Sequence, residues 1–275
     1  MGLNNIKLPA LNAVGAGQTA TLDVPLGPTY HQIDLIYRSS GTLGNEATMK
    51  ADIPDIRVKI AGKAQRTHSA AQVLEVNQFY GETTSDGVIS LFFAEPWRRT
   101  PQGEDFYAWG TADVPTFQIE VDVASGALAP TLEAYATISR ARRPLGAIKR
   151  MRRFVVPVTA TGDVQVQNLP KIGTSYNALH MIETTAGDIN SVLVEVDQTK
   201  VWDTPAFLAN SLYAQRDLVP QSGIFHVVFD YDKRAGSPLS MVKADGSVVS
   251  DFMVTANMAV AANVTILTEE TGLRF

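Results

Sequence analysis

Two aspartates separated by one residue are the best candidates for metal chemistry in this sequence of 275 residues. Asp230 and Asp232 lie in DYDKRAG, residues 230–236, where a strand pattern ends. Hard cations such as calcium prefer carboxylate and carbonyl oxygens, so calcium is the one cofactor that this pair could hold. A calcium loop of the EF-hand type would also need an oxygen ligand at Arg234 and a terminal glutamate, and both are missing. The favoured interpretation is a charged strand end, and no cofactor is predicted.

Other catalytic groups are sparse. The chain has no cysteine, so thiolate metal sites, cysteine nucleophiles and disulfides are excluded. It has four histidines, and no two are spaced as metal ligands on one strand or helix: His31, His68, His180 and His226. The sequence contains no nucleophile elbow, Walker loop, dinucleotide fingerprint or HExxH motif. These absences predict a protein that is not an enzyme.

Aromatic residues gather in the segment around TPQGEDFYAWG, residues 100–110. They are Trp97, Phe106, Tyr107 and Trp109. Such a cluster could line a sugar-binding surface, or it could pack a long loop against the core or against a neighbouring subunit. Packing is the favoured interpretation, and carbohydrate binding stays open as the alternative.

Cations are concentrated in SRARRPLGAIKRMRRF, residues 139–154. They are Arg140, Arg142, Arg143, Lys149, Arg150, Arg152 and Arg153. The net charge of −5 argues against general nucleic-acid binding, because phosphate contacts need a surplus of Lys and Arg on the binding face. The simpler interpretation is a solvated linker. The alternative is that Arg150, Arg152 and Arg153 contact anionic lipid headgroups or an acidic neighbour.

One strand pattern occurs twice along the chain. GPTYHQIDLI from Gly27 matches GTSYNALHMI from Gly173 at an offset of 173 − 27 = 146. The run 56–60 matches 192–196 at 136, and GVISLFF, 87–93, matches GIFHVVF, 223–229, again at 136. TFQIEVDVA from Thr116 aligns with DFMVTANMA from Asp251 at 251 − 116 = 135. The single jump of ten lies between the first two matches, where loops accept length changes easily.

Each copy is also expected to hold one short helix. In the first copy, Ser69 and Gln72 have capping-box spacing and Gly81 is a stop signal. In the second copy, Thr204 followed by Pro205 predicts a cap residue and then a proline at the first helical position.

The repeat predicts an all-β chain of two tandem jelly-roll β-sandwiches, because alternating short strands and frequent turn signals suit antiparallel sandwiches rather than βαβ units. The expected boundaries are an N-terminal jelly roll with its arm at 1–143, a basic linker at 144–153 and a C-terminal jelly roll at 154–275.

The sequence resembles the major capsid proteins of tailless, membrane-containing icosahedral bacteriophages of the corticovirus type. The stretches that carry the resemblance include GQTATLDVPLGPTYHQIDLIY, IPDIRVKIAGK, GVISLFFAEPW, WGTADVPTFQIEVDVA and VTATGDVQVQNLPKIGTSYNALHMI. The resemblance implies a double jelly roll that forms homotrimers with a pseudo-hexagonal footprint, which tile an icosahedral shell around an internal lipid membrane.

The same resemblance implies the partners and the location of the protein. Its partners would be other copies of itself, penton or minor capsid proteins and the viral membrane, without sequence-specific binding of nucleic acid. It would be made in the cytoplasm of a bacterial host and reside in the virion capsid. The alternative is a carbohydrate-binding β-sandwich module of a phage or cell surface.

Overall fold

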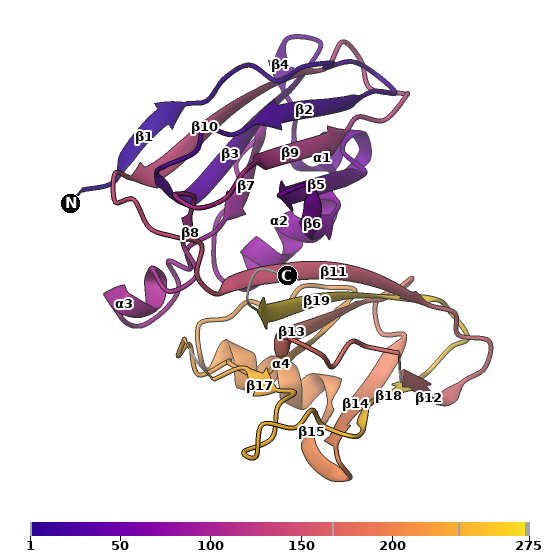
Figure 1. The fold of residues 1–275 in the computed structure, drawn as a ribbon. Helices are drawn as coiled ribbons and strands as arrows, with labels where there is room; N and C mark the ends of the chain where they lie inside the picture. The colour runs from indigo at the N-terminus through magenta and orange to yellow at the C-terminus, as the bar shows by residue number, and fades with distance from the viewer. Residues whose placement is uncertain (1, 167, 236, 273–275) are drawn as a thin grey trace. The chain divides into compact units, whose positions relative to one another are not determined.

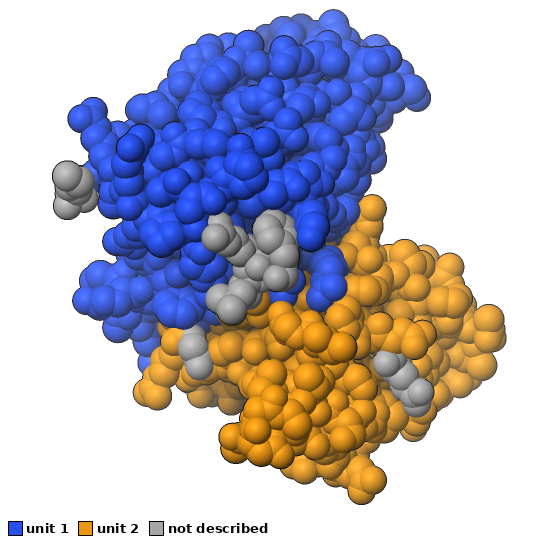
Figure 2. Space-filling model, viewed as in Figure 1, with its two compact units in different colours: residues 1–152, 274–275 blue, residues 153–273 orange. Residues whose placement is uncertain are grey.

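The computed structural model describes residues 2–166, 168–235 and 237–272, which fall into two compact units. Unit 1 ends at Arg152 and unit 2 begins at Arg153 (Figure 2). Each unit contains two packed layers of mainly antiparallel strands (Figure 1). The predicted all-β class with two tandem sandwiches is therefore confirmed.

Unit 1 has one sheet in the order β1-β10-β3-β4, in which β7 and β8 also pair with β3. Its strands are β1 (Asn4–Lys7), β3 (Thr29–Ser39), β4 (Thr42–Leu43), β7 (Val88–Phe92), β8 (Trp109–Gly110) and β10 (Thr131–Ser139). The opposing layer has the order β6-β5-β9-β2, with β2 (Thr19–Asp23), β5 (Asp55–Ile60), β6 (Lys63–His68) and β9 (Phe117–Asp122). The helices are α1 (Glu46–Asp52), α2 (Ala70–Phe79) and α3 (Pro101–Glu104).

Unit 2 repeats this plan with fewer helices among its described residues. One layer has the order β16-β13-β19, with β17 also on β13, and the other has the order β12-β18-β14-β15. The strands are β12 (Gly162–Val166), β13 (Ser175–Ile182), β14 (Ile189–Val196), β15 (Thr199–Pro205), β16 (Ile224–Val228), β17 (Leu239–Ser240), β18 (Phe252–Met258) and β19 (Val264–Gly272). Its helix is α4 (Ala206–Ala214), and β11 (Ile148–Val156) contains the division between the units.

The two-residue period of the strands builds the core. In β5, the side chains of Ile56, Val58 and Ile60 are fully buried, whereas Arg57 lies on the opposite face and forms an ion pair with Asp122 of β9. Alternate side chains of a strand point to opposite faces, so one face supplies apolar area to the core and the other carries charges.

The sequence repeat is a repeat of strand pairing. In unit 1, Ile36 of β3 lies opposite Val88 of β7, and in unit 2 Ile182 of β13 lies opposite Ile224 of β16. These partners differ by 182 − 36 = 146 and 224 − 88 = 136, the offsets found in the sequence. The other pairings recur as well: β3 with β10 and β13 with β19, β5 with β9 and β14 with β18, β2 with β9 and β12 with β18.

A matched pair of tyrosines makes the same hydrogen bond in each unit. The Tyr30 hydroxyl donates to the carbonyl of Pro25, and the Tyr176 hydroxyl donates to the carbonyl of Pro170, both at 2.6 Å. Both side chains are fully buried. Burial raises the pKa of Tyr30 to about 12, so its hydroxyl stays protonated and remains a donor.

We expect Tyr30→Phe and Tyr176→Phe to destabilise the protein by similar amounts, about 1 kcal/mol each, because each change removes one buried hydrogen bond and keeps the ring. The free energy of unfolding measured in urea would check this. A cost at one position with none at the other would contradict the equivalence of the two tyrosines.

Both predicted helices are present in the expected segments, but the predicted start of the second helix was wrong by one residue. Ser69 and Gln72 form the predicted capping box at the start of α2. Thr204 is not the cap of α4, because it is paired with Val192 in the β14–β15 ladder, which continues through Pro205. The helix therefore starts one residue later than predicted, with Pro205 as its N-cap and no side-chain capping bond.

Two helices of unit 1 were not predicted. α1 lies in the segment whose extra length was attributed to a loop, and the Asn45 side chain caps it by accepting a hydrogen bond from the Thr48 amide at 2.9 Å. α3 is a single turn that Thr100 caps in the same way, through the amide of Gly103 at 3.1 Å. Both were missed because such short helices have too few residues to display a helical apolar period.

Candidate functional site

The predicted metal pair is divided between the interior and the surface of unit 2. Asp230 is buried and its Oδ2 accepts a hydrogen bond from the side-chain Nδ2 of Asn177 at 2.9 Å. Asp232 lies nearer the surface, where Oδ1 accepts the backbone N–H of Arg234 at 3.0 Å. Among the described residues, no three His, Cys, Asp or Glu side chains come together as a metal site.

The predicted basic linker contains a strand. Residues 148–156 form β11, which begins with a parallel pairing of Met151 with Arg66 of β6. On this strand Arg150 and Arg152 are half-buried and Arg153 is exposed. In the part of the chain that the structure describes, no helix is both long enough and apolar enough to span a bilayer.

Lys149 belongs to a buried charge cluster of unit 1, formed by Glu95, Arg98 and Lys149. Arg98 Nε lies 2.7 Å from one carboxylate oxygen of Glu95, and Lys149 Nζ forms an ion pair with the other. The three side chains are between 2% and 5% exposed. The Lys149 ammonium also lies over the rings of Tyr80 and Tyr107, at 5.4 and 5.6 Å from their centroids. Two cations share one carboxylate and the ring faces stabilise the remaining positive charge.

Arg66 links the start of β11 to strand β7 through hydrogen bonds to backbone carbonyls. Its Nε donates to the backbone carbonyl of Lys149 at 2.9 Å and its Nη1 donates to the carbonyl of Phe92 at 2.6 Å. The guanidinium stacks near Phe93 and Trp109, 5.0 and 5.2 Å from the ring centroids. The cluster and Arg66 therefore bury Lys149 and hold the backbone at the start of β11, within the segment that was interpreted as a solvated linker.

The aromatic segment packs mainly inward. Tyr107 and Trp109 are fully buried, and Trp109 contacts the ring of Phe93 at a centroid distance of 4.6 Å. Trp97 stacks on Tyr80 with ring centroids 4.4 Å apart. Phe106 is 49% exposed and contacts the ring of Tyr107 edge-on. The other three positions favour packing over a sugar-binding surface, because stacking sugars needs exposed ring faces.

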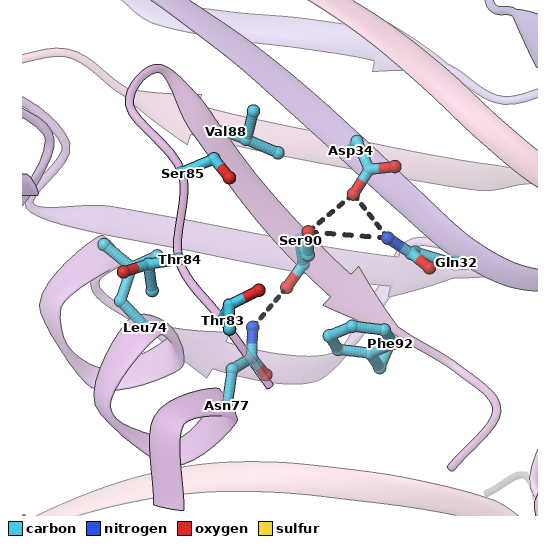
Figure 3. A pocket seen from close by; sticks show the side chains of 10 residues that line it. All are labelled: Gln32, Asp34, Leu74, Asn77, Thr83, Thr84, Ser85, Val88, Ser90 and Phe92. Carbon is cyan, nitrogen blue, oxygen red and sulfur yellow. Dashed lines mark hydrogen bonds between the residues drawn. The ribbon is translucent and has the colours of Figure 1, made fainter. Parts of the chain in front are cut away.

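A polar pocket of about 160 Å³ lies between β3, β7, α2 and the segment 83–85 of unit 1 (Figure 3). Asp34 Oδ1 accepts hydrogen bonds from Ser90 Oγ at 2.6 Å and from Gln32 Nε2 at 2.7 Å. Asn77 of α2 donates to the carbonyl of Ser90 at 2.9 Å. Asp34 is the one titratable side chain among the described lining residues. The pocket can accommodate water or a small hydrogen-bonding group.

The matching place in unit 2 holds two histidines. Asp34 corresponds to His180 at the offset of 146, and Ser90 corresponds to His226 at 136. The Nδ1 atoms of His180 and His226 are 2.8 Å apart, and both residues are buried. His226 Nε2 accepts the Gln221 amide at 3.3 Å, so the proton of His226 must sit on Nδ1 and is donated to His180.

The hydrogen bond between the two rings also determines which nitrogen of His180 is left for its proton. His180 then carries its proton on Nε2, which lies 3.7 Å from Glu269 Oε1. Burial and the neighbouring His180 hold the pKa of His226 well below its usual value, against a smaller opposite effect of Glu269. Local spacing could not reveal this pair, because the two residues are 46 positions apart. The signal was available in the repeat, since β3 and β7 match β13 and β16.

Comparison with known families covers nearly the whole chain. Residues 5–139 match the viral coat protein P2 N-terminal domain and residues 148–273 match the viral coat protein P2 C-terminal domain. The major capsid protein P2 of Pseudoalteromonas phage PM2 is 25% identical over 261 residues, which cover 92% of this chain and 84% of that protein.

Solved structures share the fold at lower sequence identity. The crystal structure of the major capsid protein P2 from bacteriophage PM2 has a TM-score of 0.88 at 20% identity, covering 100% of this chain and 98% of the other. The STIV MCP has a TM-score of 0.69 at 13% identity, with coverage of 100% and 98%. The PBCV-1 virus capsid structure has a TM-score of 0.62 at 11% identity, with coverage of 100% and 96%. These similarities confirm the double jelly-roll fold.

Proposed function

Because the chain belongs to the viral coat protein P2 family, we propose that it is the major capsid subunit of a phage similar to PM2. As a viral coat protein it is structural and not an enzyme. In the proposed assembly, three copies form a homotrimer with a pseudo-hexagonal footprint, and trimers tile an icosahedral shell around an internal lipid membrane. The N-terminal jelly roll, 1–143, and the C-terminal jelly roll, 154–275, joined by 144–153, supply the six jelly rolls of each trimer.

The observation that carries this proposal is the repeated strand pairing of the two units. Two sandwiches of the same topology within one chain give a trimer six similar bodies, which is what a pseudo-hexagonal tile requires. Penton or minor capsid proteins are the further partners in the proposal, since hexagonal tiles alone cannot close a shell. Synthesis in a bacterial cytoplasm, followed by assembly into the virion capsid, completes it.

Electron microscopy of the concentrated, purified protein tests the proposal. We expect negatively stained images to show hexagonal tiles, or shells and sheets made from them, at spacings that correspond to three chains for each tile. Particles that stay uniformly the size of one chain at every concentration would contradict it.

The membrane part of the proposal has a test of its own. Replacing Arg150, Arg152 and Arg153 of β11 by serine should keep the fold and weaken binding to anionic vesicles, because each cation near an anionic surface contributes about 1 kcal/mol. Vesicle co-sedimentation at low salt measures the change.

The control for this triple change removes the same charge elsewhere, at Lys7, Lys200 and Arg234, whose side chains are 55%, 59% and 75% exposed. If both triple variants lose binding equally, net charge explains the effect and the role of β11 is wrong. Unchanged binding and assembly of the β11 variant would also contradict that role.

A further inference from the structure

The helices α2 and α4 are equivalent elements of the two units. The strands β5 and β14 before the helices match at an offset of 136, and so do the strands β7 and β16 after them. The contacts of the two helices match at the same offset. Asn77 of α2 donates to the carbonyl of Ser90, and Tyr213 of α4 donates to the carbonyl of His226, both at 2.9 Å. Since 77 + 136 = 213 and 90 + 136 = 226, the two helices can be compared residue by residue.

In unit 1, α1 covers one side of α2. Lys50 of α1 forms an ion pair with Glu75 at 3.0 Å, and Gln78 donates to Glu46 of α1 at 3.2 Å. Ala71, Glu75 and Gln78 lie on one face of the helix because they are four and three residues apart, and all three are half-buried. The ten-residue excess that contains α1 is thus the cover of this face.

Among the described residues of unit 2 no helix corresponds to α1, and the face of α4 that matches the covered face of α2 is exposed. The equivalents of Ala71, Glu75 and Gln78 are Phe207, Ser211 and Ala214, and all are exposed. Phe207 is 76% exposed, and the adjacent Leu208 is 49% exposed. We call Phe207, Leu208, Ser211 and Ala214 the α4 face. A large apolar residue therefore occupies the position where the covered helix has alanine.

We infer that the α4 face is a contact surface for a second copy of this chain, an inference that rests on the proposed function. None of the nine residues of α4 is charged, so an anionic lipid surface or a nucleic acid would find no ionic partner on the helix. A neutral apolar face complements another protein surface.

The occupant is a second copy for two further reasons. The equivalent face in unit 1 is covered by a segment of this same chain, so this helix face is a packing surface in the one copy of the fold where a cover is present. The α4 face also occurs once on every copy, and the neighbours of a major shell subunit are mostly other copies. Stable contacts bury about 800 Å² per partner, so the α4 face is the anchor within a larger interface.

The test compares three proteins by light scattering across a dilution series. The double change Phe207→Ser with Leu208→Ser should raise the concentration needed for association on the order of 10-fold or more, as expected for loss of a central apolar anchor. Ile172→Ser is the control, because Ile172 is also an apolar residue of unit 2 and is 84% exposed. It should associate like the wild type, and circular dichroism should be unchanged in both variants.

A second readout uses the absence of cysteine from the chain. Ser211→Cys introduces a single thiol on the α4 face, which should react with a maleimide on the order of 10-fold more slowly in associated protein than in diluted protein, because a contact that excludes water also excludes the reagent.

Equal association of the double variant and the wild type, or an equally reactive thiol in both states, would overturn the inference while leaving self-assembly standing. A wild type that stays monomeric at every concentration would overturn both the inference and the proposed function.

Discussion

Replacing Glu95 by alanine should destabilise the protein by about 3–5 kcal/mol, because the change leaves two cations buried without their carboxylate. Arg98 and Lys149 both pair with Glu95, and none of the three side chains is more than 5% exposed. Removing one partner of a buried ionic cluster costs far more than removing an exposed one, since water cannot replace the lost charge. The effect should reach the start of β11, where Lys149 lies.

Urea unfolding followed by tryptophan fluorescence measures this cost. Trp97 and Trp109 lie in unit 1 and Trp202 lies in unit 2, so a Trp202→Phe background restricts the signal to the unit that contains Glu95. The control is Asp203→Ala, which breaks an exposed ion pair and is made in the protein that keeps Trp202. It removes the partner of Lys200 in a pair whose side chains are 59% and 57% exposed, and should cost less than about 1 kcal/mol.

The milder variant Glu95→Gln keeps the size of the side chain and covers the case in which the alanine variant fails to fold. It should still cost more than the exposed-pair control, because the carboxylate charge is lost. If the free energies of unfolding of both Glu95 variants lie within about 1 kcal/mol of the wild-type value, the cluster does not have this stabilising role.

Acid should destabilise the protein through His226 before most carboxylates titrate. Burial holds the pKa of His226 well below 6.5, so below that pH the unfolded chain binds a proton that the folded chain does not. Stability is therefore full above pH 6.5 and falls as the pH drops, by up to about 1.4 kcal/mol for each pH unit and each proton. A second proton on His226 would lie on Nε2 and end the hydrogen bond that this atom accepts from the backbone N–H of Gln221.

The pH dependence of the urea midpoint between pH 7 and pH 5, measured by circular dichroism, checks this prediction. The His180→Gln, His226→Gln double variant should lose most of the slope in that interval while remaining folded at pH 7. His31→Gln is the comparison variant: burial also lowers the pKa of His31, against the opposing charge of Asp105 at 3.2 Å, so this variant should lose a smaller part of the slope. Identical slopes for the wild type and the double variant would contradict the role of His226 in the loss of stability in acid.

The sequence allowed the repeat and its register to be predicted because both depend on local patterns. Tyr30 and Tyr176, or the strands 56–60 and 192–196, could be matched because alternating apolar residues and turn glycines are visible along the chain. Gly87 and Gly223 have φ of 74° and 78°, so the glycines that open the repeated motif occupy the same left-handed backbone conformation.

What could not be predicted depends on partners distant in the chain. Lys149 looked like part of a solvated linker because its carboxylate, Glu95, is 54 positions away and nothing near it indicates burial. The pairing of His180 with His226 required the strand order as well as the strands. The segment that contains α1 was interpreted as a longer loop. Its effect on the surface is large: among the described residues of unit 2 no helix lies at the matching place, and Phe207 is exposed.

If the chain is a self-assembling coat subunit, its mass in solution should be a multiple of the mass of one chain. Light scattering after gel filtration should give three times 29.7 kDa, or 89.1 kDa, for the proposed trimer. A monodisperse mass of 29.7 kDa that persists as the concentration is raised would contradict it.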